Sequence, residues 1–510
     1  MDTEDGQLYT DRYITPMRMQ EYHQTESEAQ YDIQIKIGPP ALSSAELREL
    51  MLSKLLRGWR KADVSLTVAC VNRSLRWPEW YSIMRGYWEP WGIHDLPGGE
   101  INGAAVLNMS ACLQRCTSWY NSRGLWEIPK GAVAHLASFY HDGRRVWGKN
   151  ELIAWAFRYV RNFQSPDNVW PLAMAKWTGG ETYDKLAAID AHVGLGAVVR
   201  ELRGTQLTFG GCTLPLEFPV ITDWMSLLPV MNNCSLPNAT VHADGVNPVI
   251  CGLCGWSAHD KTAGWREDGQ LLREFPRHAA DAREWTDAPH LYAARPSDCV
   301  WEYTHLQTRA LDTWINLYLL PQCGRLRADF SGEYHELTGS KWKTGKKLIC
   351  KETKAFYGND GWKHVRQWLH ARGDEFATLE RNCIETGRAL TWFWKFTHGK
   401  QTAEFSHADY IDSRTRLINS WAATGIATFP PCFHYLTNHV WEDASRWGPL
   451  YWLVGEAGEA AHARDNRMKW GTLRGRKKTA YDRCNTWSMM LRNFYTLKGL
   501  VQDGCFDRWD

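Results

Sequence analysis

Three carboxylate residues are placed where they could bind hard divalent cations. Asp142 and Asp223 each follow an apolar stretch that predicts a β-strand, and Glu459 lies in a GEAGEAAH segment with helical spacing. Carboxylates at strand ends and on a helix can hold two Mg²⁺ or Mn²⁺ ions, about 4 Å apart, which activate an attacking oxygen and stabilise the leaving oxygen of a phosphodiester. Because the chain has 57 acidic residues, each of these three can also be an ordinary surface or turn carboxylate.

Two further acidic residues affect the choice of candidate metal ligands. Glu456 lies three residues before Glu459 and would share its helix face. Asp244, in VHADGVN, is a rival for the position of Asp223. Gly, Asn and Pro residues surround Asp244, which is typical of a loop, so we favour Asp223.

A second group of residues has the side chains of a tetrahedral zinc site. Cys251 and Cys254 form a CxxC pair, and His434 and His439 form an HxxxxH pair. Two thiolates and two imidazoles make a complete Zn²⁺ ligand set, and an ion bound by both pairs would tie together the two ends of the long intervening segment. The alternative is a pair of free buried cysteines and two core histidines, and the spacing alone does not decide between them.

Basic residues are needed beside a site that holds DNA, because DNA is a polyanion. The densest basic clusters are KWKTGKK (341–347) and LRGRKK (473–478). Arg144 and Arg145 directly follow Asp142 and are candidates for contact with the scissile phosphate. Either cluster can instead be a solvated surface or a nuclear-import signal. The second cluster contributes four cations: Arg474, Arg476, Lys477 and Lys478.

The elements around these residues follow an α/β order. Residues 132–145, 151–160 and 169–177 have the pattern of β-strands, and the first runs into a predicted turn at Asp142-Gly143. A helix is predicted over 182–202, and the apolar run 216–222 predicts a fourth strand that ends at Asp223. Three strands, a helix and a fourth strand are the opening order of an RNase H-like fold.

Helical spacing dominates from about residue 255 to about residue 430. It is clearest in four segments, 305–320, 361–371, 377–396 and 407–423. A helical block between the sheet and the C-terminal region indicates an insertion. Near the N-terminus, SSAELRELMLSKLLRGWRK (43–61) predicts a helix.

Bulk composition limits the class of protein. At about 100–200 residues per domain, 510 residues allow two to four domains, or one core with a large insertion. The net charge is only +2, so if the protein binds nucleic acid it must do so through local patches. The sequence predicts no membrane span and no signal peptide. The 14 cysteines are therefore expected to be reduced thiols or metal ligands.

The order of these segments resembles that of Transib-type transposases and of the catalytic region of the RAG recombinase. The shared features are Asp-Gly after a strand, FPVITDWM, CGLC, and lastly FHYLTNH followed by GEAGEAAH, which is the most specific part. The resemblance covers roughly residues 135–500, and the helical block matches only loosely. The stretch from Asp223 to Cys251 is longer than in the family, and no counterpart of the recombinase's RING-type and nonamer-binding modules precedes residue 130.

This resemblance implies a DDE-type transposase or recombinase that acts on double-stranded DNA, at transposon ends and at target sites, as a homodimer in the nucleus. The implied catalytic residues, which bind Mg²⁺ or Mn²⁺, are Asp142, Asp223 and Glu459. The implied zinc ligands are Cys251, Cys254, His434 and His439. The alternatives are a domesticated, inactive relative that keeps the zinc-clipped fold and binds DNA or protein, and a nuclease that cuts without joining.

The predicted fold class is α/β, with an RNase H-like mixed sheet and flanking helices. A large, mostly helical, zinc-clipped insertion interrupts the sheet, and a mainly helical N-terminal region precedes it. The predicted divisions are residues 1–130 for the N-terminal region, 131–250 for the first half of the core and 251–430 for the insertion. Residues 431–510 would complete the core with the catalytic Glu helix and basic C-terminal helices.

Overall fold

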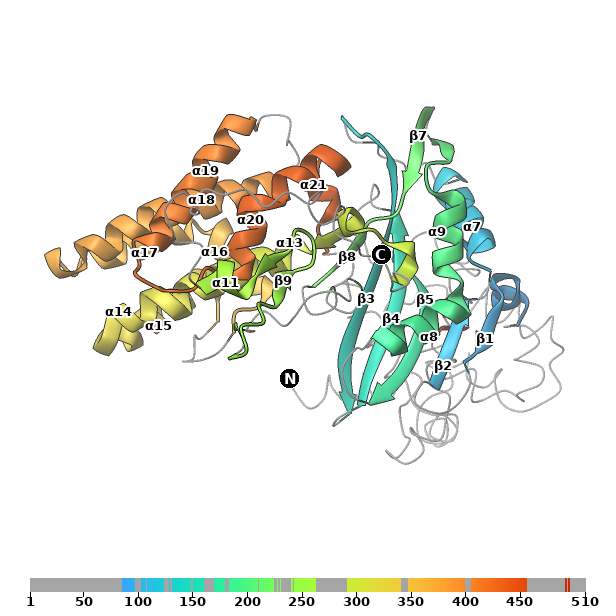
Figure 1. Cartoon of the computed structure of the whole chain (residues 1–510), viewed down its shortest axis with the longest axis horizontal. Coiled ribbons are helices and arrows are strands. Elements are labelled where there is room, and N and C mark those ends of the chain that lie inside the picture. Colours follow the sequence, from blue (N-terminus) through green and yellow to red (C-terminus); the bar gives the residue numbers. More distant parts are fainter. Residues whose placement is uncertain are drawn as a thin grey trace, which may run out of the picture. The chain divides into compact units, whose positions relative to one another are not determined.

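The computed structural model describes most of residues 85–262 with short gaps, residues 291–340, 347–399 and 405–455, and four residues between 491 and 495. Over these residues the chain is a mixed α/β protein, as predicted (Figure 1). It divides into two compact units. Unit 1 comprises Met1–Trp126, Phe139–Glu201 and Ala457–Asp510, and unit 2 comprises Glu127–Ser138 and Leu202–Glu456. The predicted helix at 43–61 lies outside the described residues.

Unit 1 contains an antiparallel sheet. β4 (Asn150–Tyr159) and β5 (Val169–Thr178) pair along most of their length and confirm two of the predicted strands. β5 pairs on its other side with β2 (Asn102–Val106), which pairs with β1 (Ile93–Asp95). Trp170 of β5 is fully buried, and the hydroxyl of Tyr495 donates to the Pro171 carbonyl at 2.7 Å. Tyr495 therefore contributes to the core of unit 1.

The N-terminal region contains two short strands, β1 and β2, besides helical residues. In the described part of that region these strands accompany residues 85–88, which are helical, and α7 (Met109–Ser122), so the expectation of a mainly helical region stays a prediction. β2 has the sequence NGAAV, whose small residues give little sign of a strand. Gly103 lies so close to β5 that a Cβ atom there would clash with the backbone of Met174. This close approach of two backbones explains the glycine.

The first predicted strand is longer than expected. β3 spans His135–Trp147, so Asp142 and Gly143 lie within the strand and the predicted turn at this dipeptide is wrong. Arg144 and Arg145 lie in the same strand. β4, which begins at Asn150, is the neighbour of β3 in the sheet. Hydrogen bonds to a neighbouring strand outweigh the local turn preference of Asp-Gly, because strand formation depends on pairing.

The predicted helix over 182–202 is two helices, α8 (Tyr183–Val193) and α9 (Leu195–Leu202). Gly194 separates them with a φ of 69°, in the left-handed region that favours glycine. The backbone N–H of Gly196 donates to the Asp190 carboxylate at 3.1 Å. The break therefore has a local cause in the sequence Val-Gly-Leu-Gly.

Unit 2 contains the parallel part of the sheet. The first residues of β3 pair in parallel with β7 (Cys212–Glu217), which forms a hairpin with β6 (Gln206–Phe209). β8 (Val220–Thr222) pairs with β3, and in parallel with β11 (Cys299–Trp301). The predicted strand 216–222 is thus the end of β7 followed by β8, and Pro219 lies between them. The predicted strand end immediately before Asp223 is confirmed.

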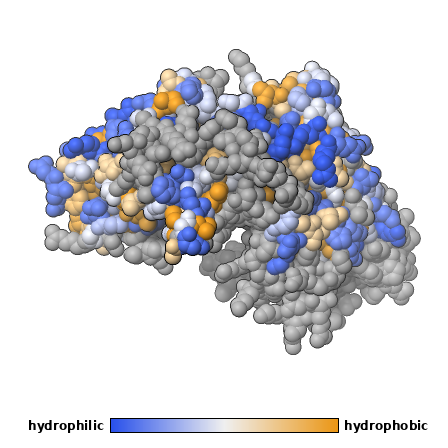
Figure 2. All heavy atoms as spheres, viewed as in Figure 1, coloured by the Kyte–Doolittle hydropathy of each residue, from blue (hydrophilic) through white to orange (hydrophobic). Residues whose placement is uncertain are grey.

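Helices form most of unit 2 after β11, and we call residues 303–447 the helical block (Figure 1). All four predicted helical segments are confirmed, the first as α13 (Tyr303–Thr313), a π-helix (Trp314–Leu319) and α14 (Leu320–Cys323). On the face shown in Figure 2, the described surface of these helices is mostly hydrophilic, with scattered hydrophobic residues. The other helices of the block are α15 (Arg327–Thr338), α16 (Cys350–Gly358), α17 (Gly361–His370), α18 (Ala377–His398), α19 (His407–Ala422), α20 (Pro431–Asn438) and α21 (Val440–Trp447).

The remaining elements are short. Before the helical block lie β9 (Val249–Cys251), β10 (Trp256–Ser257) and α11 (Ala258–Thr262). Among the described helices, none has both the length and the hydrophobicity of a membrane span. The 3₁₀ turns are η3 (Glu89–Trp91), η6 (Leu291–Ala293), η7 (Pro296–Asp298), η9 (Gly324–Leu326), η10 (Asp374–Phe376) and η12 (Leu450–Leu453).

A buried carboxylate joins three parts of unit 2. Asp298, directly before β11, accepts from Arg203 at 2.7 Å, from Arg446 at 2.8 Å and from Arg295 at 3.2 Å. Only 1% of the Asp298 side chain is exposed, whereas the three arginines reach solvent in part. The network ties Arg203, near the start of the segment Leu202–Glu456, and the C-terminal part of α21 to the start of β11.

Removing this carboxylate should destabilise the protein, because three guanidinium groups would lose their shared partner. Asp298→Ala is expected to lower the free energy of unfolding by about 3 kcal/mol, as for a buried ion pair that loses one member. Denaturant unfolding measures this change. Asp412→Ala, which removes an exposed carboxylate paired with Arg416, should cost less than about 1 kcal/mol. Equal losses in the two variants would contradict the structural role of Asp298.

A half-buried histidine predicts a loss of stability in acid. Burial lowers the pKa of His398, at the end of α18, to about 4, and its ring stacks on Trp394 with centroids 3.8 Å apart. The same side chain titrates near 6.5 when unfolded, so between these values protons bind to the unfolded chain and not to the folded one. His398 therefore contributes stability above about pH 6.5 that is lost as the pH falls toward 4, at up to about 1.4 kcal/mol per pH unit.

Urea unfolding at pH 7, 6 and 5 tests this prediction. His398→Gln should flatten the decline in stability between pH 6.5 and 5, whereas His335→Gln, at an exposed site, should leave it unchanged. The assignment to His398 is wrong if its variant declines as steeply as the parent protein.

Candidate metal centre

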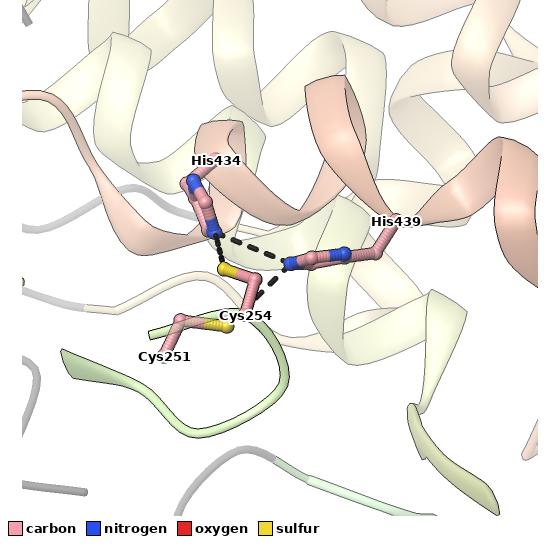
Figure 3. Close-up of side chains that lie close together, drawn as sticks. All are labelled: Cys251, Cys254, His434 and His439. Atoms are coloured by element: carbon pink, nitrogen blue, oxygen red, sulfur yellow. Dashed lines mark hydrogen bonds between the residues drawn. The ribbon is translucent and has the colours of Figure 1, made fainter. Parts of the chain in front are cut away.

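Two cysteines and two histidines that are distant in the sequence meet in the interior of unit 2 (Figure 3). Cys251 Sγ lies 3.5 Å from His439 Nε2, and Cys254 Sγ lies 3.3 Å from His434 Nε2. The two Nε2 atoms are 3.2 Å apart, and all four ligand atoms lie within 4.8 Å of one another. Sulfur and nitrogen atoms on a tetrahedron around one Zn²⁺ would be separated by about 3.3–3.8 Å. The cluster therefore has dimensions close to those of a zinc site.

A tight turn supplies the two thiols. Cys251 ends β9, which pairs with β10, and Gly255 N–H donates back to the Cys251 carbonyl at 2.8 Å. Gly255 has a φ of 78°, which a residue with a side chain rarely adopts. The glycine after the CxxC pair thus lets the chain turn sharply enough for both sulfur atoms to face the same point.

Two short helices supply the imidazoles. Pro431 begins α20, where a missing backbone N–H costs nothing. His434 lies within α20, and His439 lies at the junction of α20 and α21. Figure 3 shows that the two rings approach from the helices, opposite the turn that carries the cysteines.

Neighbouring side chains hold both rings. His439 Nδ1 lies 3.1 Å from a Glu442 carboxylate oxygen, which places the ring proton on Nδ1 and leaves Nε2 able to bind a metal. Trp256 stacks on His434 with centroids 4.3 Å apart and an interplanar angle of 9°. His434 Nδ1 faces the side-chain amide of Asn438 at 3.3 Å. Both Nε2 atoms are thus directed at the sulfurs.

The protonation states of these side chains also favour a bound cation. Burial raises the pKa of the Cys251 thiol, but hydrogen bonds from Cys254 and the two histidines outweigh it, so the pKa lies well below the usual value. Burial and the neighbouring Cys251 raise the pKa of Cys254. Burial lowers the pKa of His434, which keeps its ring neutral, as ligation requires. A divalent ion would stabilise both thiolates at once, so these residues could hold Zn²⁺, as the sequence predicts.

The structure describes only part of the predicted carboxylate set. Asp223 directly follows β8 and is half-buried. Asp142 lies in β3, with its side chain outside the described residues. Glu459 and the cluster LRGRKK, with Arg474, Arg476, Lys477 and Lys478, also lie outside them. The convergence of the three carboxylates therefore stays a prediction.

The rival residue Asp244 occupies a loop, as its sequence context predicts. It is exposed, and its carboxylate accepts from the backbone N–H of Val246 at 3.1 Å. This is a local Asx-type bond that stabilises a turn. Asp223 is thus the better candidate of the two for a strand-end carboxylate.

One buried carboxylate beside Asp223 was not predicted. Glu302 follows β11 as Asp223 follows β8, and its backbone N–H donates to the Thr222 carbonyl at 2.9 Å. The only signal in the sequence is the short apolar run Cys-Val-Trp before an acidic residue and a helix.

No protein-family model and no curated protein matches this chain.

Replacing a zinc ligand should release the metal and destabilise unit 2. We expect one zinc per chain in the purified protein and a loss of most of it in Cys251→Ser, because a hydroxyl is a poor ligand beside a single thiolate. Elemental analysis and thermal unfolding measure the two effects, and the midpoint should fall by at least about 4 °C. Cys383→Ser, at a buried cysteine of α18, should keep its zinc. Full zinc content in Cys251→Ser would rule out the shared site.

Proposed function

We propose that this protein is a DDE-type DNA transposase or recombinase with an RNase H-like core. The observation that carries the proposal is the meeting of the CxxC pair with the HxxxxH pair across the helical block. The HxxxxH pair opens the segment in which the resemblance to Transib-type transposases and the RAG recombinase is most specific. In that family the corresponding four residues bind zinc.

The order of elements supports the same class. β3, β4 and β5 are followed by α8 and α9 and then by β8, which is the order expected for the opening of an RNase H-like fold. Asp223 stands at the end of β8, where the second catalytic carboxylate is expected. The hairpin of β6 and β7 is an addition between the helices and β8.

The proposed chemistry is hydrolysis followed by strand transfer. Asp142, Asp223 and Glu459 would hold two Mg²⁺ or Mn²⁺ ions, which supply activation of the attacking oxygen and stabilisation of the leaving one. Water attacks a phosphodiester, the bond to the 3′-oxygen breaks, and a 3′-hydroxyl and a 5′-phosphate result. The 3′-hydroxyl then attacks a phosphodiester of the target DNA, the bond from that phosphorus to the target's 3′-oxygen breaks, and the target strand is left with a free 3′-hydroxyl. Zn²⁺ would have a structural role.

Positive charge in the helical block supports a role in DNA binding. A cavity of about 670 Å³ between α17 and α18 is lined by four cationic residues, two of which pair with glutamates, by Asp360, and by aromatic rings that include Trp362 and Trp392. Such surfaces bind the DNA backbone through charge and exposed bases through stacking. The cationic residues are Lys363, Arg366, Arg388 and Lys395.

The other DNA contacts belong to the same proposal. Arg144 and Arg145 would contact the scissile phosphate, and the cluster LRGRKK would contact the strand that passes the Glu459 segment. A homodimer would bring two DNA ends together in the nucleus.

Cleavage of supercoiled plasmid by the full-length protein tests the proposal. With Mg²⁺ or Mn²⁺ we expect nicked and joined products, and none after chelation. Asp142→Ala, Asp223→Ala and Glu459→Gln should each abolish cleavage but keep zinc and DNA binding, because each removes a metal ligand. Asp244→Ala is the matched control and should cut normally.

Three outcomes would contradict parts of this account. Cleavage by any one of the three variants would remove that residue from the site. DNA binding without metal-dependent cleavage by the parent protein would favour the inactive, domesticated relative. Cut strands without joined strands would favour a nuclease.

A further inference from the structure

The ends of β8 and β11 place two acidic residues at one edge of the sheet. The strands are parallel, with Trp301 opposite Thr222, and the pairing extends by one bond from Glu302 N–H to the Thr222 carbonyl. Asp223 and Glu302 are therefore the first residues beyond two adjacent strand ends. At this edge of parallel strands, ligands and catalytic groups commonly lie.

The side chain of Glu302 caps a helix. Glu302 is 3% exposed, and its carboxylate accepts from the backbone N–H groups of Thr304 at 3.0 Å and His305 at 2.7 Å. Both residues lie in the first turn of α13, where the backbone N–H groups have no partner within the helix. The carboxylate is therefore fixed by the start of the helical block.

A third donor comes from a distant part of the chain. The backbone N–H of Gly455 donates to the same carboxylate oxygen that Thr304 uses. Gly455 is the first residue of the GEAGEAAH segment, four residues before Glu459. A Cβ atom at position 455 would lie 2.7 Å from Glu302 Cδ, so any residue larger than glycine would displace the carboxylate.

The charge of Glu302 makes this contact strong. Burial raises the pKa of Glu302, but His305 and the three backbone N–H groups together lower it by more. The pKa of Glu302 therefore lies below its usual value. Hydrogen bonds to an ionised acceptor are stronger than neutral ones. Because three backbone donors occupy the two oxygens, Glu302 is a poor candidate for a metal ligand itself.

We propose that Glu302 is a positioning residue of the DNA-cleaving site, because it bonds Gly455 beside the strand end of Asp223 and so fixes the point from which the chain continues to Glu459. This inference rests on the proposed function. In this role Glu302 itself contacts neither DNA nor metal. The residue acts through the start of the segment that carries the third carboxylate.

The dependence of cleavage on Mg²⁺ concentration tests this role. Glu302→Ala and Gly455→Ala should each raise the half-saturating Mg²⁺ concentration by about tenfold, the usual effect of losing an outer-shell partner. The double variant should do no worse than either single one, since both changes break the same contact. Glu302→Gln keeps one acceptor oxygen and should lie between Glu302→Ala and the parent protein.

Matched controls separate positioning from general loss of stability. Glu352→Ala removes another buried helix-capping carboxylate, at α16, and Gly332→Ala fills open space in α15. Both should leave the half-saturating Mg²⁺ concentration unchanged. Zinc content should stay at one per chain in all variants, because the zinc ligands do not contact Glu302.

Amide hydrogen exchange measures the hydrogen bond between Gly455 and Glu302 independently of activity. Exchange at Gly455 should be at least about tenfold faster in Glu302→Ala than in the parent protein, because its acceptor is gone. Unchanged exchange would refute the contact. Unchanged Mg²⁺ dependence in a parent protein that cuts DNA would refute the positioning role alone, whereas a parent protein that never cuts would overturn the proposed function.

Discussion

The convergence of four buried ligand side chains is the constraint on which the rest of unit 2 depends. Two thiols and two imidazoles lie within 4.8 Å of one another in the interior, where unpaired polar groups are costly. The closest cysteine and histidine are 180 residues apart in the sequence. A cation bound here would close a very long loop and contribute folding free energy directly.

The same helices connect the metal centre to the strand ends. Tyr435, beside His434 in α20, accepts from the Trp301 backbone N–H at 3.0 Å, and its hydroxyl donates to Asp443 at 2.9 Å. Trp301 directly precedes Glu302, which caps α13 and holds Gly455. The candidate metal centre and the strand ends that carry Asp223 and Glu302 therefore share one buried hydrogen-bonded framework, and a distortion of the first would reach the second.

The elements that were predicted correctly are those marked in the sequence by hydrophobic periodicity or by a short motif. The strands β4 and β5, the long helices of the block and the two zinc pairs were all expected from local patterns. Strands of three residues, such as β8 and β11, show no usable period, so β11 was missed. The Gly-Gly pair at 210–211 was the available signal for the hairpin of β6 and β7. Glu302 could not be recognised, because its role comes from a contact with a glycine 153 residues away.

X-ray absorption at the zinc edge of the purified full-length protein tests the central claim most directly, because it reports the ligand atoms themselves. The account predicts a shell of two sulfur atoms at about 2.3 Å and two imidazole nitrogens at about 2.0–2.1 Å. A shell of oxygen and nitrogen alone, a shell of four sulfurs, or protein without stoichiometric zinc would contradict it.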